Sequence, residues 1–157
     1  MSFVDEYRHA QRCEDIARLR RALALRAMLA TGMSQREIAN DLGISQPAVS
    51  QQLKFAPALD LVHPEILLEA AVPILMKLAS DRGYENLAVF GSAARREARM
   101  DSDIDLLVDA PEGTSSFAFI RFKQLIEKVL GREIDLVDYG GLKPGVDDDI
   151  RREAVSL

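Results

Sequence analysis

Apolar side chains recur at intervals of three and four residues through the first thirty positions of the chain. They include Ile16, Leu19, Leu23, Ala27 and Ala30. Neither Gly nor Pro occurs in residues 5–30, so this spacing predicts one long helix with a single buried stripe. Gly32 predicts the end of that helix, because Gly is the usual residue just beyond a helix C-terminus.

Two short helices separated by a tight turn are predicted next. Ser34 and Glu37 have the spacing of a capping box at the start of the first helix. The expected inner face of this helix consists of Ile38, Ala39 and Leu42. Gly43 permits the turn, and Ser45 can cap a second helix that we expect to continue to about Phe55. The pattern indicates a small unit of three helices.

Short apolar runs typical of strands begin only in the second half of the chain. Residues 87–90 (LAVF) form the first run, which Gly91 and Ser92 end, and residues 103–108 (DIDLLV) form the second. A third run, at residues 132–137 (REIDLV), alternates polar and apolar side chains in the same way. Because successive strand side chains point to opposite faces, we expect Ile104, Leu106 and Val108 of the second run, and Ile134 and Leu136 of the third, to face a core. The Asp residues should face away from it.

Three further helical segments are predicted around these strands. Pro64 can open a helix over residues 65–81, and Pro73 is expected to kink or split it. Residues 93–100 are expected to form a short helical turn. Helical spacing recurs at Phe119, Phe122, Ile126 and Val129. Gly131 follows this last pattern, which predicts a helix crossing from the second strand to the third.

Composition is that of an ordinary globular protein. The 157 residues are 48% hydrophobic and 29% charged, and no apolar run approaches the ~20 residues of a membrane span. The N-terminus lacks the apolar stretch of a secretory signal. Cys13 is the one cysteine, and His9 and His63 are the two histidines, so the sequence indicates neither a disulfide nor a zinc cluster. We therefore expect a cytoplasmic protein without membrane contact.

Charge is distributed unevenly along the chain. The net charge is −5. Residues 1–56 contain eight Lys or Arg against six Asp or Glu, a net +2, whereas residues 57–157 carry a net −7. A nucleic-acid role, if the chain has one, therefore belongs to the N-terminal third, where the basic excess is slight. The acidic remainder fits a metal-dependent site better than a DNA-binding surface.

Candidate chemistry lies where the first two strands meet. Asp103 and Asp105 project from one side of the second strand, about 6–7 Å apart at Cα, and such a pair can bracket divalent cations. The bend at Gly91 and Ser92 offers a backbone N–H and a hydroxyl to phosphate oxygens. Carboxylates beside such a bend indicate phosphoryl or nucleotidyl transfer. The alternative is an acidic surface cluster at the end of a hairpin.

The stretch FGSAARREARMDSDIDLLV resembles the minimal nucleotidyltransferase (MNT) branch of the polymerase-β-type nucleotidyltransferase superfamily. The signature is Gly-Ser and Asp-x-Asp separated by ten residues, here 93–102. The resemblance extends from residue 86 to the C-terminus and implies a third acid on a later strand, which Asp135 matches. It implies that the catalytic and metal-binding residues, for two Mg²⁺ ions, are Asp103, Asp105 and Asp135. The residues it implies for binding ATP or another nucleoside triphosphate are Gly91, Ser92 and Arg95.

In this family many proteins are antitoxins that transfer AMP to a tyrosine of a HEPN-type ribonuclease toxin. The resemblance implies the same class of reaction and partner here. One departure is Arg96, which stands where the family usually has Gly. If this position requires a positive φ, Arg is strained there, which bears on turnover more than on fold. The alternatives are a transcriptional regulator whose MNT domain binds nucleotide or a partner without catalysis, and transfer to a small molecule.

The segment SQREIANDLGISQPAVSQQLK resembles the helix-turn-helix DNA-binding unit of bacterial regulators. Residues 45–54 would be its recognition helix. The side chains that we expect to contact DNA are Arg36, Ser45, Gln46, Ser50, Gln51 and Lys54. Gln and Ser suit bases, whereas Arg and Lys suit phosphates. A homodimer reading half-sites about 34 Å apart is expected. The alternative is a helical domain used for packing or dimerisation.

Together these patterns predict an α+β protein. An N-terminal all-α helix-turn-helix domain (residues 1–56) and a linker (57–63) precede a small polymerase-β-like nucleotidyltransferase domain (64–157), with helices packed on a mixed sheet. A DNA-binding unit fused to an antitoxin would suit a protein that represses its own operon. Residues 147–149 are three consecutive Asp. Acids at a helix start complement the helix dipole, so we interpret them as solvated and not as a metal cluster.

Overall fold

The computed structural model describes residues 1–54 and 58–157. Its elements are, in order, α1 (Phe3–Ala30), α2 (Gln35–Leu42), α3 (Gln46–Lys54), the 3-10 helix η1 (Leu59–Leu61), α4 (Pro64–Asp81), β1 (Glu85–Phe90), α5 (Gly91–Ala94), β2 (Ile104–Asp109), α6 (Ser116–Leu130), β3 (Ile134–Asp138), the 3-10 helix η2 (Tyr139–Gly141), α7 (Asp148–Glu153) and β4 (Val155–Ser156). The predicted α+β class is confirmed. Phe55, the expected end of the second short helix, lies outside the described residues. No helix in the described ranges is both long and apolar enough to cross a membrane.

The four strands form one mixed sheet in the order β3-β2-β1-β4. β1 is antiparallel to both β2 and β4, and β2 is parallel to β3. Parallel neighbours need a crossover connection, which α6 supplies, as its apolar spacing predicts. β4 has only two residues, too few for an alternating pattern, and the sequence does not reveal it.

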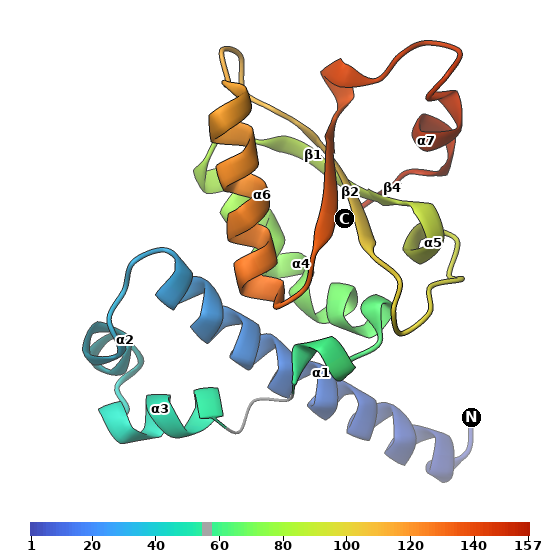
Figure 1. Cartoon of the computed structure of the whole chain (residues 1–157). Coiled ribbons are helices and arrows are strands. Elements are labelled where there is room, and N and C mark those ends of the chain that lie inside the picture. The colour runs from blue at the N-terminus through green and yellow to red at the C-terminus, as the bar shows by residue number, and fades with distance from the viewer. Residues whose placement is uncertain (55–57) are drawn as a thin grey trace.

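The larger hydrophobic core lies on one face of the sheet, beneath α4 and α6 (Figure 1). The strand residues in it are Leu87, Val89, Ile104, Leu106, Val108, Ile134 and Leu136. This set confirms the predicted inner faces of the second and third strands. A smaller cluster on the opposite face joins Ala88, Phe90 and Leu107 to Leu142 of the C-terminal segment. Asp105 and Asp135 alternate with the buried residues and therefore lie on this second face.

Helix α1 contributes to two cores. Leu19 and Leu23 belong to the larger core, whereas Leu25 packs with Ile38, Ala39 and Val49 in a separate cluster of the three N-terminal helices. Polar contacts also join α1 to the sheet-bearing part. The Arg26 guanidinium donates to the carbonyl oxygens of Val129 and Lys128, both at 2.8 Å, at the end of α6. The long N-terminal helix is thus packed against both parts of the chain, and the division at residues 57–63 stays a prediction.

Pro73 does not split its helix, since α4 is assigned as one helix from Pro64 to Asp81. Proline has no N–H, so the carbonyl four residues earlier, that of Glu69, loses its helical donor. The guanidinium of Arg20 donates to this Glu69 oxygen at 3.3 Å and to that of Ala70 at 2.9 Å. A side chain of α1 therefore supplies a hydrogen bond that Pro73 cannot make.

Three local predictions are wrong in detail. Leu42 is 48% exposed and not on the inner face, because Ile44, beyond the turn, packs against the cluster in its place. Ser34 accepts from the backbone N–H of Glu37, as predicted, but the Glu37 carboxylate bonds to the Ser34 hydroxyl and not to its backbone. The expected helical turn at residues 93–100 is confined to the short helix α5.

Candidate active site

The sheet brings two of the predicted acids side by side. Asp105 of β2 is in register with Asp135 of β3, and on its other side it is opposite Phe90, the last residue of β1. Asp103 directly precedes β2. Asp103 and Asp135 are exposed, whereas Asp105 is half-buried. The carboxylates therefore meet at one edge of the sheet face that the C-terminal segment covers.

Asp105 carries the chemical signature of crowded carboxylates. Its pKa is raised from 3.8 to about 6, first by burial, then by a hydrogen bond with Asp135 and by the charges of Asp135, Asp103 and Glu153. Each of these causes disfavours the ionised form of Asp105. A cation at this position would reverse that effect, because an opposite charge favours the ionised carboxylate.

Gly91 lies against Asp105, directly after β1. Its φ is +70°, and a Cβ at this position would overlap the Asp105 carboxylate. Gly is therefore required both by the left-handed backbone and by the space. Ser92 follows in α5 and is half-buried. The structure thus places the predicted phosphate-holding bend in contact with the predicted acids.

Arg96 has the backbone conformation that the missing Gly of the family signature would favour. Its φ is +58°, in the left-handed region where an L side chain is strained. The condition under which the sequence predicts strain at Arg96, a positive φ, is therefore met.

Glu153 of α7 is a neighbour of this site that the sequence does not single out. One carboxylate oxygen accepts from the backbone N–H of Gly91 at 3.0 Å, and the other accepts from Nη1 of Arg95 at 2.8 Å. Arg95 also contacts Glu97 at 3.3 Å. The hydrogen bond to Glu153, and then that to Glu97, raise the pKa of Arg95. Glu153 lies in the closing stretch that contributes to the family resemblance, but no spacing rule connects it to residues about sixty positions earlier.

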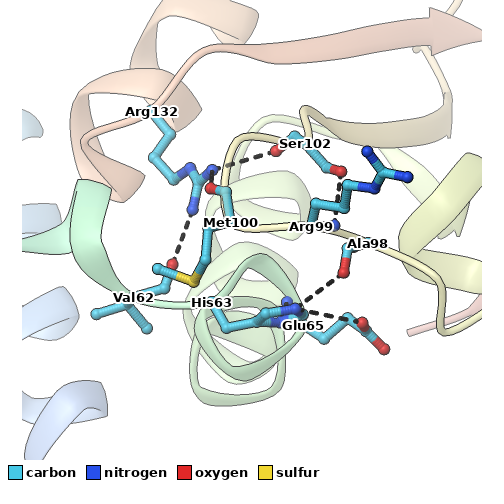
Figure 2. Close-up of polar contacts among 8 residues, drawn as sticks. All are labelled: Val62, His63, Glu65, Ala98, Arg99, Met100, Ser102 and Arg132. Carbon is cyan, nitrogen blue, oxygen red and sulfur yellow. Dashed lines mark hydrogen bonds and ion pairs between the residues drawn. The ribbon is translucent and has the colours of Figure 1, made fainter.

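Arg132, just before β3, holds the segment that leads into Asp103 (Figure 2). Its guanidinium donates to the carbonyl oxygens of Met100 at 2.7 Å and Ser102 at 3.1 Å. It also donates to the carbonyl of Val62 at 2.8 Å. Val62 belongs to the connector between the helical unit and α4. One side chain therefore ties the connector to the backbone next to Asp103.

His63 makes a second link between the connector and this segment (Figure 2). Its Nδ1 accepts from the backbone N–H of Glu65 at 3.2 Å and so caps α4. Nε2 then carries the proton and donates to the carbonyl of Ala98 at 2.9 Å. This imidazole has a structural role at the start of α4.

The described residues contain no ready-made group of three or more His, Cys, Asp or Glu side chains that could hold a metal ion. The donor set nevertheless fits a hard cation, because Mg²⁺ is bound through one or two protein carboxylates together with substrate phosphates. Asp105 and Asp135 are adjacent, and Asp103 is close enough for its charge to act on Asp105. Cation binding at these residues stays a prediction.

The predicted DNA-contacting side chains lie on a separate surface. Arg36, Ser45, Gln46, Ser50, Gln51 and Lys54 are all exposed. The Ser45 hydroxyl also accepts from the backbone N–H of Ala48 at 3.2 Å and so caps α3. Helices α2 and α3 lie beyond the C-terminal end of α1, while α5 and α7 lie on the other side of the molecule (Figure 1). Nucleic acid on α3 would therefore lie away from α5 and α7.

Two protein families match the sequence. Residues 74–157 match the nucleotidyltransferase domain family, and residues 20–63 match the arsR family of bacterial regulatory proteins. The second match covers the three helices in which the helix-turn-helix was predicted, and α2 and α3 have that arrangement.

Individual proteins with names of nucleotidyltransferases are also similar to this chain. "Putative protein adenylyltransferase MJ0435" of Methanocaldococcus jannaschii is 41% identical over 86 residues, which are 55% of this chain and 88% of that protein. "Protein adenylyltransferase MntA" of Thermococcus cleftensis is 42% identical over 73 residues, 46% of this chain and 74% of that protein. A solved structure, "Structure of putative minimal nucleotidyltransferase", superposes with a TM-score of 0.54 at 39% identity, over 59% of this chain and 95% of that one.

Proposed function

Because the chain belongs to the nucleotidyltransferase domain family, we propose that it transfers AMP from ATP, or another nucleotidyl group from its triphosphate, to a protein hydroxyl. The observation that carries this proposal is the register of Asp105 with Asp135 beside Gly91. The names of the two relatives, both protein adenylyltransferases, support AMP as the group and a protein as the acceptor.

Asp103, Asp105 and Asp135 would hold Mg²⁺, with two ions expected from the family resemblance. The raised pKa of Asp105 supports this role, since crowded carboxylates gain from a cation. When bound, the metal supplies positive charge that neutralises the triphosphate.

The reaction would use the remaining groups for binding and proton transfer. Gly91 and Ser92 would bind the β- and γ-phosphates, and Arg95 would offset their charge. The acceptor oxygen would attack the α-phosphorus in line, and Asp135 would take the proton of the attacking hydroxyl. As the new phosphorus–oxygen bond forms, the bond to the bridging oxygen breaks and pyrophosphate leaves. Holding both reactants in line accounts for much of the rate enhancement.

The helical unit supports a second activity on the same chain. We propose that α3 binds DNA through Gln46, Ser50 and Gln51, with Arg36 and Lys54 at the phosphates, and that two copies of the chain read two half-sites. In the context of the transferase, this arrangement suits an antitoxin that modifies a HEPN-type toxin and represses its own operon. A cytoplasmic location suits a protein that uses both DNA and a nucleoside triphosphate.

The test uses the full-length chain, Mg²⁺, ATP labelled at the α-phosphate and the product of the adjacent reading frame. Label should appear on that protein, and Asp103→Ala should abolish the transfer while leaving DNA binding intact, because Asp103 is exposed just before β2, whereas α3 packs in the separate cluster of the N-terminal helices. DNA binding without transfer by the wild-type chain would favour the alternative, a transcriptional regulator whose nucleotidyltransferase domain binds nucleotide or a partner without catalysis.

A further inference from the structure

Glu153 contacts two of the three residues that the proposed reaction assigns to the triphosphate. Its carboxylate accepts from the backbone N–H of Gly91 and from the guanidinium of Arg95. A carboxylate and a phosphate present the same kind of acceptor oxygen to such donors. In this structure a side chain of α7 therefore stands where phosphate oxygens are expected.

Glu153 and a phosphate oxygen cannot both accept from the same N–H donor. Arg95 has five N–H donors and could serve Glu153 and a phosphate together. The backbone of Gly91 has one N–H, and Glu153 uses it. A phosphate oxygen can therefore accept from Gly91 only when Glu153 has moved away.

Charge makes the joint occupancy still less favourable. The charge of Glu153 already contributes to the raised pKa of Asp105, so the carboxylate is close to the acids of the site. A triphosphate would add several negative charges beside Glu153. Like charges held at short distance in a partly buried site repel strongly.

The helix that carries Glu153 packs only through partly buried side chains, among them Ile150 against the smaller cluster. Helix α7 has six residues and none of them is buried, and β4 beyond it has two exposed residues. Segments with few buried apolar contacts open locally with much less free energy than the core requires. Movement of α7 would leave the larger core intact, since that core lies on the other face of the sheet.

We propose that Glu153 is a positioning residue that holds Gly91 and Arg95 in the nucleotide-free protein and competes with the triphosphate for them. The proposal rests on the proposed function and adds that Glu153 sets the affinity for nucleotide. Binding of the triphosphate releases Glu153, and α7 moves away from α5.

The variant that tests this is Glu153→Gln, which keeps a neutral acceptor oxygen for Gly91 and removes the charge. Binding of α,β-methylene ATP with Mg²⁺ to the full-length chain is measured by calorimetry, and KM and kcat are measured in the transfer assay. The Kd and KM should fall by about three- to tenfold, because the competitor is weakened. The matched control is Glu97→Gln, which removes an equal charge beside Arg95 but leaves the bond from Gly91 to Glu153 in place. Its Kd should change by less than about twofold.

A rise in Kd and KM for Glu153→Gln, or no change, would contradict the proposal that Glu153 competes with the triphosphate. If the wild-type chain binds no nucleotide and transfers nothing, and Glu153→Gln is equally inactive, the proposed function fails together with this inference. A second measurement needs no variant. Hydrogen exchange of residues 148–153 in the wild-type chain should become faster when α,β-methylene ATP binds. Slower or unchanged exchange would contradict the proposed movement of α7.

Discussion

The backbone conformation of Arg96 and the ionised form of Asp105 each cost free energy in the folded chain. Arg96 adopts a left-handed backbone at φ +58°, which costs an L residue about 1–2 kcal/mol. Asp105 has a pKa of about 6 because burial and neighbouring acids disfavour its charge. Strain at single residues tends to gather at functional sites, and both residues flank the candidate active site.

Replacement of Arg96 by Gly should stabilise the protein. Gly adopts positive φ without strain, although it loses more backbone entropy on folding. The net gain should be about 0.5–1 kcal/mol, which raises Tm by about 1–4 °C in a chain of this size. The matched control is Arg99→Gly in the same loop, whose φ is not positive and whose Tm should stay or fall. An equal or lower Tm for Arg96→Gly would show that the arginine side chain offsets the strain.

Asp105→Asn should stabilise the metal-free protein at neutral pH. The folded state binds a proton at Asp105 up to about pH 6, whereas the unfolded chain releases it near the usual value of 3.8. This group therefore lowers the stability of the wild type as pH rises from about 4 to 6. In EDTA at pH 7 the variant should be about 1 kcal/mol more stable, a value reduced for solvent screening.

The pH dependence separates this cause from a packing effect. Thermal unfolding in EDTA should give a difference between wild type and Asp105→Asn that is largest at pH 7 and becomes small near pH 4, where Asp105 is neutral in the folded protein. A difference of the same size at both pH values would contradict the electrostatic account. Replacement of EDTA by Mg²⁺ should raise Tm of the wild type more than that of the variant.

The sequence predicts a site residue where the local backbone requires a particular residue type. Gly91, Asp103 and Asp105 follow from the Gly-Ser bend and from strand alternation, and Asp135 follows from the family resemblance. Glu153 does not, because its role depends on the chain folding back against a bend some sixty residues earlier. Contacts of this kind leave no periodicity and no spacing to detect.

At the level of elements, the segment between α5 and β2 is held by its neighbours as well as by hydrogen bonds of its own between Arg99 and Ser102. Arg132 and His63 bond to the carbonyl oxygens of Met100, Ser102 and Ala98 (Figure 2). This explains why residues 95–100 do not form the helix that their composition allows. The position of Asp103 depends on these contacts from outside the segment.

Arg132→Ala should therefore affect both stability and transfer. Loss of the charged donor to three carbonyl oxygens should cost about 2 kcal/mol, and the freed segment should misplace Asp103 and lower kcat by more than about tenfold. Chemical denaturation and the transfer assay measure the two effects. The control is Arg99→Ala, an exposed residue of the segment that Arg132 holds. Its free energy of unfolding and its kcat should stay near the wild-type values. Full transfer activity of Arg132→Ala would show that Arg132 is not needed to position Asp103.

Elements with clear periodicity are predictable from the sequence, and those defined by distant partners are not. α6 follows from its apolar spacing and Gly131, and α2 and α3 follow from Ser34, Gly43 and Ser45. The two-residue strand β4 depends on pairing with β1. The continuity of α4 through Pro73 depends on Arg20 of another helix. Tertiary contacts decide such cases over local preference.

For the whole molecule, α1 is the element that unites the two predicted activities. It supplies Leu19 and Leu23 to the core of the sheet-bearing part and Leu25 to the core around α2 and α3. Helix α3 lies on a different side of the molecule from α5 and α7, the helices that carry Gly91 and Glu153 (Figure 1). The slight basic excess of residues 1–56 and the acidic remainder agree with this separation.

The most direct test of the account compares Asp135→Asn with Glu133→Gln in the transfer of α-phosphate label from ATP. The two acids are exposed and lie two positions apart on the same face, but only Asp135 is in register with Asp105. We expect Asp135→Asn to lower the rate at least about a hundredfold and Glu133→Gln to retain it. Equal rates for the two variants, or transfer by Asp135→Asn at the wild-type rate, would contradict the account.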